Sequence, residues 1–202
     1  MAITIRKIAC PEPPVGADLM KTGQTTSYRT GDDGDIEAGR DVDFFTLASN
    51  NPFGNTNRFT DELGGQTYTN NILIDWSTYN SIAGTVLGYV RRFWSLGTAT
   101  WDDAIDNSLA YSVGTFTSGW RLINRTELNN ICNMNNALYP FNYFPFNAVF
   151  GGNTWTSNTF MVNTTYAWHL NNTSAQISYQ LKTTNSYYFP VRTFTVTGTT
   201  LT

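Results

Sequence analysis

Residues 118–131, SGWRLINRTELNNI, decide how the fold is interpreted, because a short apolar strand stands directly before a capped helix. In Trp120-Arg121-Leu122 two large apolar side chains flank a charged one. Alternation of this kind predicts a strand that buries Trp120 and Leu122 between a sheet and a helix. We expect Arg121 to pair with a carboxylate or with loop carbonyls, because a charge at such a place needs a partner.

The helix that follows is predicted to start at Asn124. Asparagine is a favoured N-cap residue, and Glu127 stands three positions later, which is the spacing of a capping box. The negative charge of Glu127 also suits the positive end of the helix dipole. Leu128, Ile131 and Cys132 share one helical stripe, so this face is predicted to lie on the core.

A second helix is predicted after Thr100. Trp101-Asp102-Asp103 resembles a capping box with aspartate in place of glutamate. The residues expected on its buried face are Trp101, Ala104, Ile105 and Leu109.

Most of the remaining chain has the pattern of short strands. Residues 58–77 are predicted to form a hairpin, with Gly64-Gly65 and Asn70-Asn71 as turn candidates. Residues 139–152 form an aromatic segment broken by proline, and several strands with Asn-rich turns follow it. Two helices among many short strands predict an α+β fold.

The first 20 residues differ in character from the rest. Residues 3–8 alternate as an edge strand does, and a proline-rich linker follows them. We therefore expect an N-terminal anchoring arm at 1–20 and one folded domain at 21–202.

The composition limits the classes of function that this chain can have. The 202 residues are 41% hydrophobic but only 13% charged, with a net charge of −3. This is not the profile of a disordered chain. No basic block indicates a nucleic-acid partner, and no apolar run reaches the roughly 20 residues that span a bilayer. The start has no uninterrupted apolar core of signal-peptide length.

Neither a metal nor a cofactor is expected. Cys10 and Cys132 show no metal-ligand spacing, so we expect two reduced thiols, with a disulfide as the alternative. Residues 32–43 form an acidic loop whose spacing does not fit an EF-hand. A solvated loop is the favoured interpretation of that segment, and calcium binding stays open. Its acidic residues are Asp32, Asp33, Asp35, Glu37, Asp41 and Asp43.

Catalysis is not expected either. His169 is the only histidine, and it alternates with Trp168 on a predicted strand. A Ser-His-Asp triad needs a nucleophile and an orienting acid around such a base, and nothing in the sequence marks them. We therefore predict a structural histidine in a protein that is not an enzyme.

Binding is the favoured function, through the aromatic and asparagine-rich segment 139–189. Aromatic faces beside amide groups suit sugars or protein epitopes. The candidate ligand-binding residues are Tyr143, Asn153, Trp155, Asn158, Tyr166, Trp168 and Tyr187.

Four segments in order, 22–40, 57–77, 100–131 and 154–194, resemble the domain family named for the C-terminal domain of the Legionella collagen-like adhesin. The resemblance implies a C-type-lectin-like fold, with two helices on small twisted antiparallel sheets and long loops. It also implies adhesion and a homotrimer. The residues that carry the fold signature are Trp101, Trp120, Arg121, Leu122, Glu127 and Arg192.

The chain departs from the family pattern in two ways. Ile123 stands where the family has proline, and cysteines often found near the first helix and near the closing Val-Arg are missing. The missing bridge fits a reducing cytoplasm and favours a phage product. Our first hypothesis is a phage virion protein that contacts other virion proteins through 1–20 and attaches to a host-surface glycan or protein. The alternatives are a secreted or surface-bound bacterial adhesin and a purely structural virion component.

Overall fold

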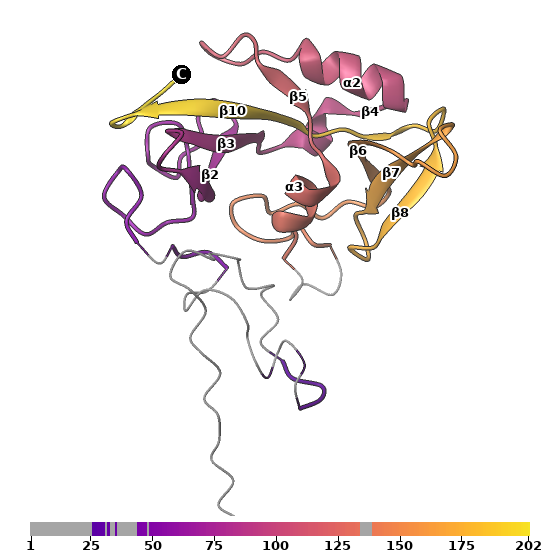
Figure 1. The fold of residues 1–202 in the computed structure, drawn as a ribbon, viewed down its shortest axis with the longest axis horizontal. Coiled ribbons are helices and arrows are strands. Elements are labelled where there is room, and N and C mark those ends of the chain that lie inside the picture. The colour runs from indigo at the N-terminus through magenta and orange to yellow at the C-terminus, as the bar shows by residue number, and fades with distance from the viewer. Residues whose placement is uncertain (1–25, 31, 33–34, 36–43, 48, 134–138) are drawn as a thin grey trace, which may run out of the picture.

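The computed structural model describes residues 26–30, 32, 35, 44–47, 49–133 and 139–202. Within them lie two α-helices, one 3-10 helix and eleven strands (Figure 1). In chain order these are β1 Phe59–Thr60, β2 Ile72–Asn80, β3 Thr85–Val90, η1 Phe93–Leu96, β4 Thr98–Ala99, α2 Trp101–Leu109, β5 Trp120–Leu122, α3 Arg125–Asn130, β6 Asn153–Thr159, β7 Tyr166–Asn171, β8 Ile177–Leu181, β9 Ser186–Tyr187, β10 Pro190–Thr197 and β11 Thr200–Leu201.

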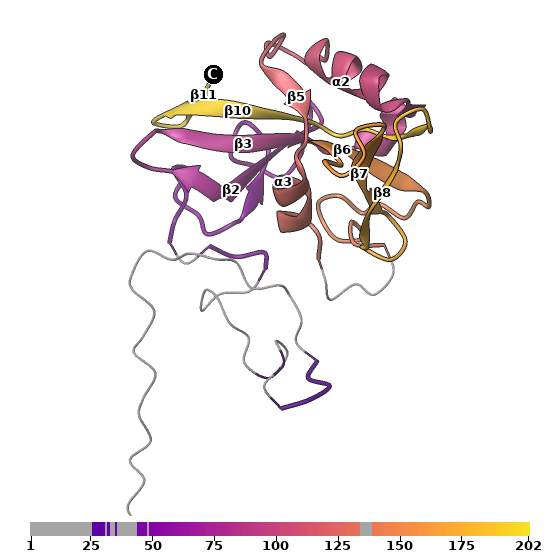
Figure 2. The same cartoon turned by 45° about the vertical axis from the view of Figure 1, so that its right-hand side comes forward.

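The strands form two sheets that lie side by side (Figures 1 and 2). The six-stranded sheet has the order β1-β2-β3-β10-β11, and β5 also pairs with β10. The five-stranded sheet has the order β4-β9-β6-β7-β8. Every pairing is antiparallel except the single contact between β6 and β9. This confirms the prediction of a small α+β domain.

The Trp-Arg-Leu strand is β5, and it lies along β10. Trp120 pairs with Arg192, and Leu122 pairs with Pro190. In both views α2 lies beside β5, to its right, and α3 lies below it (Figures 1 and 2). Trp120 and Leu122 are buried, as predicted.

The predicted hairpin at 58–77 is formed by β1 and β2, which pair antiparallel. Asp61 organises the connection between them. Its carboxylate accepts backbone N–H groups of Leu63, Gly65, Thr67 and Tyr68, and the Thr67 hydroxyl as well. Burial by itself raises the pKa of Asp61, but these hydrogen bonds outweigh it and the pKa is lowered.

A buried ion pair lies at the β1 edge of the six-stranded sheet. The guanidinium of Arg58 contacts the carboxylate of Asp75 at 2.8 and 2.9 Å, and both side chains are fully buried. Arg58 also donates to the carbonyls of Phe44 and Asn130, and its guanidinium lies 4.2 Å from the Phe44 ring centroid. Each donor group is thereby matched, which a buried charge requires.

The first helix, α2, is capped as predicted, and Trp101, Ala104 and Ile105 of the predicted face pack inward, but Leu109 does not. The Thr100 hydroxyl accepts from the Asp103 N–H, and Ala104 is buried. Leu109, predicted to be buried, is 57% exposed. Ser108 takes the inward position instead, where its hydroxyl donates to the Ala104 carbonyl at 2.7 Å. Serine is small enough for close helix packing, and its hydroxyl finds a partner within the helix.

The second helix, α3, follows the prediction closely. Asn124 and Glu127 form a reciprocal capping box. Leu128, Ile131 and Cys132 are buried, and Cys132 is a free thiol.

The predicted arm 1–20, its strand at 3–8 and Cys10 lie outside the described residues, as does most of the acidic loop 32–43. Of that loop the structure describes Asp35, which is exposed, and Asp32. Its carboxylate accepts the backbone N–H groups of Tyr28, Arg29 and Asp35, so here the acidic side chain serves a turn.

Candidate functional site

A bidentate ion pair joins the Trp-Arg-Leu motif to α3. Arg121 donates to both carboxylate oxygens of Glu127, at 2.8 and 2.5 Å. Glu127 also accepts the backbone N–H of Asn124 at 3.0 Å. One carboxylate therefore closes the capping box and fixes the strand end, which confirms that Arg121 pairs with a carboxylate.

The other signature residues also serve the fold. The Trp120 indole N–H donates to the Phe116 carbonyl. Arg192 lies over the rings of Phe116 and Phe194, with its guanidinium 5.1 and 4.8 Å from their centroids. The Trp101 indole N–H donates to the Thr156 carbonyl and ties α2 to the five-stranded sheet.

Two of the predicted ligand-binding residues lie in the core. Trp155 is fully buried, and its indole N–H donates to the Ala99 carbonyl at 3.0 Å. Tyr143 is also buried, and its hydroxyl donates to the Ile131 carbonyl. Both side chains have apolar neighbours and a satisfied polar atom, so neither has a surface to offer a ligand. The expectation that they contact one is corrected on this ground.

Asn153 and Tyr187 are partly buried, and their contacts lie elsewhere in the sheet. The Asn153 amide donates to the Gln180 side chain at 2.8 Å. The Tyr187 ring packs edge-on against Phe150, with centroids 4.9 Å apart. These contacts assign both residues to the support of the five-stranded sheet.

Tyr166 and Trp168 form part of a surface cluster. We call it the aromatic platform, and it consists of Phe160, Tyr166, Trp168 and Tyr179. Tyr166 and Trp168 point to one face of β7 because side chains two apart along a strand share a face. Tyr179 on β8 stands directly opposite Trp168 in the antiparallel register. Alternation on β7 and β8 therefore brings Tyr166, Trp168 and Tyr179 together, and Phe160 joins them from the segment after β6.

The rings of the aromatic platform hold one another in place. Phe160 and Tyr179 stack with centroids 4.0 Å apart and an interplanar angle of 5°. Trp168 meets both of them edge-on, at 5.3 and 6.0 Å. Tyr166 meets Tyr179 edge-on at 5.7 Å. These are the favoured geometries of aromatic pairs, so the surface is pre-organised.

Polar groups border the aromatic platform. The Arg125 guanidinium lies over the Trp168 ring, 4.6 Å from its centroid. The Arg125 backbone N–H donates to the Asn158 side-chain oxygen at 2.8 Å, which ties the start of α3 to the end of β6. Asn158, predicted to bind a ligand, is exposed here.

Further exposed apolar groups lie on the same strand and in the turn next to the aromatic platform. Met161 and Val162, in the turn between β6 and β7, are 82% and 86% exposed. Tyr179 and Leu181 on β8 are each nearly half exposed. Exposed apolar groups gathered beside a polar border are typical of an interaction surface.

Sequence reasoning missed Phe160 and Tyr179. The alternation in QISYQL assigns Tyr179 to one face of its strand, but only the pairing of β7 with β8 sets it opposite Trp168. Phe160 follows the end of β6, and its backbone N–H donates to the Tyr166 carbonyl across the turn. No local pattern marks that contact.

His169 is buried beside Trp155, with ring centroids 6.3 Å apart. Burial lowers the pKa of His169, so the ring is neutral at physiological pH. Among the described residues, no three histidine, cysteine, aspartate or glutamate side chains gather in a way that would hold a metal ion.

Neither α-helix in the described part of the chain has the length and apolar composition needed to cross a bilayer. No curated protein matches the chain in sequence. The family model described as Lcl C-terminal domain does match, over residues 65–192, which is more than half of the chain. The match begins within the Asp61 turn and ends on β10, so it includes both helices and the aromatic platform. On this match, the chain belongs to the Lcl C-terminal domain family.

Proposed function

We propose that this protein is a non-enzymatic adhesion module that binds a host-surface glycan through the aromatic platform. The family indicates an adhesin-like domain. The single observation that carries the proposal is the cluster of Trp168, Tyr179, Phe160 and Tyr166 at the surface, with the Arg125 guanidinium over one ring. Flat aromatic faces take the C–H faces of sugar rings, and neighbouring polar groups bind their hydroxyls.

We propose in addition that the small α+β domain is C-type-lectin-like. Its support is the presence of two helices beside small, mostly antiparallel sheets with long connections. The binding surface then lies on the smaller sheet, away from the packed face of the six-stranded sheet.

The setting we propose is a phage virion. The arm 1–20 joins the particle, and the domain is displayed as a homotrimer. Cys132 is a buried free thiol, and the cysteines of the family pattern are absent, which suits folding in a reducing compartment. A secreted bacterial adhesin and a virion component without a ligand are the competing settings.

The direct test is binding of the purified protein to host cells. Trp168→Ala with Tyr179→Ala removes the centre of the aromatic platform. Ile82→Ala is the matched control, because Ile82 is 99% exposed in the turn between β2 and β3. We expect the wild type and the control to bind saturably. The affinity of the platform variant should be about tenfold lower or more, because two central aromatic contacts are lost.

Two treatments of the cells identify the ligand class. Mild periodate oxidation destroys sugar rings, whereas protease treatment removes protein receptors. Loss of binding after periodate alone supports the glycan. Loss after protease alone, or equal binding by the platform variant and the control, contradicts the proposal. A chelator in one arm tests whether the acidic loop 32–43 contributes a calcium site.

A further inference from the structure

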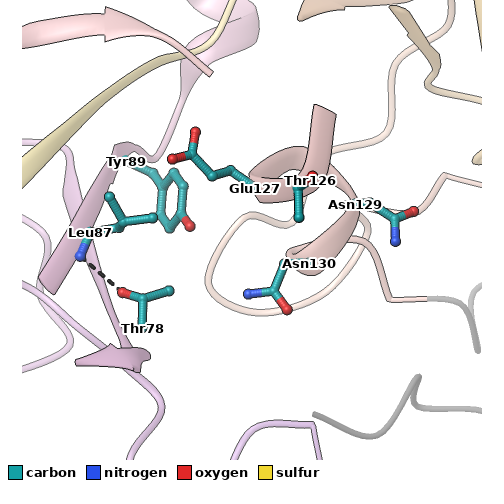
Figure 3. Close-up of a pocket in the computed structure, with 7 residues that line it drawn as sticks. All are labelled: Thr78, Leu87, Tyr89, Thr126, Glu127, Asn129 and Asn130. Atoms are coloured by element: carbon teal, nitrogen blue, oxygen red, sulfur yellow. Dashed lines mark hydrogen bonds between the residues drawn. The ribbon is translucent and has the colours of Figure 1, made fainter. Parts of the chain in front are cut away.

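A concave site lies between α3 and the strands β2 and β3 (Figure 3). Its volume is about 270 Å³. It shares no residue with the aromatic platform. The residues that line it are Thr78, Leu87, Tyr89, Thr126, Glu127, Asn129 and Asn130.

Tyr89 carries an unused hydroxyl at this site. The residue is fully buried, and its ring is held against Phe189 with centroids 5.7 Å apart. The hydroxyl has no hydrogen-bond partner among the described residues, and it points toward α3 (Figure 3). Burial, and then the nearby charge of Asp75, raise the pKa of Tyr89 well above its usual value, so the group stays a neutral donor. A buried polar group without a partner is rare and calls for one.

The charges around the cavity are already neutralised. Both oxygens of Glu127 are bound by Arg121. Behind the wall, Arg58 and Asp75 form their own buried pair. With every nearby charge matched, the site favours a neutral ligand over an ion.

The helix contributes unused polar groups. One face of α3 carries Thr126 together with Asn129 and Asn130, which follow it by three and four positions. The side-chain amides of Asn129 and Asn130 make no hydrogen bond with another described residue. Figure 3 places the Asn130 amide on the side of the helix that faces β3.

The strands contribute an apolar wall. The Thr78 hydroxyl is already engaged, since it donates to the Asp75 carbonyl and accepts the Leu87 N–H. Leu87, which is partly exposed, therefore presents mainly carbon to the cavity, and the buried Tyr89 ring lies behind this wall.

We propose that this cavity binds one neutral monosaccharide unit, with the Tyr89 hydroxyl and the Asn130 amide as hydrogen-bonding groups and Leu87 as the apolar contact. The volume lies just below the range of roughly 300–1,000 Å³ that is usual for drug-sized ligands, which suits a single ring. A sugar ring offers both hydroxyls and C–H faces, matching the two walls. This site does not depend on the aromatic platform.

The test is isothermal titration calorimetry of the full chain with glucose, galactose and N-acetylglucosamine, each titrated separately. We expect saturable binding of at least one sugar. Tyr89→Phe is expected to weaken it about three- to tenfold, the effect of one lost hydrogen bond. Asn130→Ala is expected to weaken it similarly, while its backbone carbonyl still serves Arg58. Tyr111→Phe is the control, because it removes the hydroxyl of a partly buried tyrosine that does not line the cavity.

Thermal unfolding separates binding from structure. Without sugar, Tyr89→Phe should melt at or above the wild-type temperature, because it deletes an unpartnered polar group. A lower melting temperature for Tyr89→Phe assigns the hydroxyl a structural role and overturns the proposal. So does the absence of binding of all three sugars, or wild-type affinity in Tyr89→Phe. Loss of monosaccharide binding in Trp168→Ala would show that the sugar binds at the aromatic platform, and this would also overturn the cavity proposal. Failure of the protein to bind host cells contradicts only the proposed function and not the cavity proposal.

Discussion

Trp155 and Trp168 lie on neighbouring strands of one sheet and have opposite surroundings. Trp155 on β6 is sealed against Leu122 and Ala104, with its N–H bonded to a carbonyl. Trp168 on β7 is partly exposed, with rings at its edges and Arg125 over its face. Both stand in Asn- and Thr-rich sequence. The face of the strand, rather than the residue type, separates an aromatic group that holds the fold from one that offers a surface.

The largest loss of stability is expected from replacing Arg58, whose side chain is buried at the six-stranded sheet. Arg58→Ala leaves Asp75 as an unpaired buried charge and is expected to cost about 5 kcal/mol of unfolding free energy. Urea denaturation followed by circular dichroism measures this. Replacing both partners together, Arg58→Met with Asp75→Leu, should recover most of the loss. A cost below about 1 kcal/mol for Arg58→Ala would mean that water reaches the pair.

The comparison of the two tryptophans is tested directly by removing each. Trp155→Ala is expected to cost about 4 kcal/mol, because it leaves a large cavity in the core. Trp168→Ala should cost about 1 kcal/mol or less and affect cell binding instead. Equal losses of stability in the two variants would contradict the distinction between core and surface.

Asp61 gives a smaller effect that depends on pH. Its folded-state pKa lies below the unfolded value of about 3.9, so its contribution is fully present above that pH and is lost as the pH falls through the folded pKa. Asp61→Asn should cost about 2 kcal/mol at pH 7 and progressively less in acid.

Unfolding at a series of pH values between neutral and strongly acidic reveals this convergence. Asp106→Asn, on the exposed side of α2, is the control and should track the wild type at each pH. A constant difference between Asp61→Asn and the wild type across the series contradicts the role assigned to its hydrogen bonds.

Local features were predictable where the deciding contacts are close in sequence. The capping box at Asn124 and Glu127 and the burial of Leu128 depend on residues within one or two turns. The family resemblance, carried by ordered motifs, was likewise readable. Ser108 and Leu109 could not be assigned in this way, because helical spacing alone does not say which side of a short helix meets β5.

The candidate site needed the strand pairing. Tyr143 and Trp155 looked like ligand residues by composition, yet their burial follows from contacts with Ile131 and Ala99, which no sequence period reports. Arg58 was passed over for a related reason. Charged side chains are almost never fully buried unless paired, and its partner stands 17 residues away.

The position of Arg58 also has a consequence for the order of folding. One guanidinium joins the Phe44 carbonyl, β2 and the carbonyl of Asn130, which is 72 residues along the chain. The hydrogen bonds of the guanidinium are complete only when all three segments are in place. Contacts between residues so far apart in the sequence form slowly. Hydrogen exchange at β2 and α3 should therefore follow a single opening event, with the two segments protected and released together.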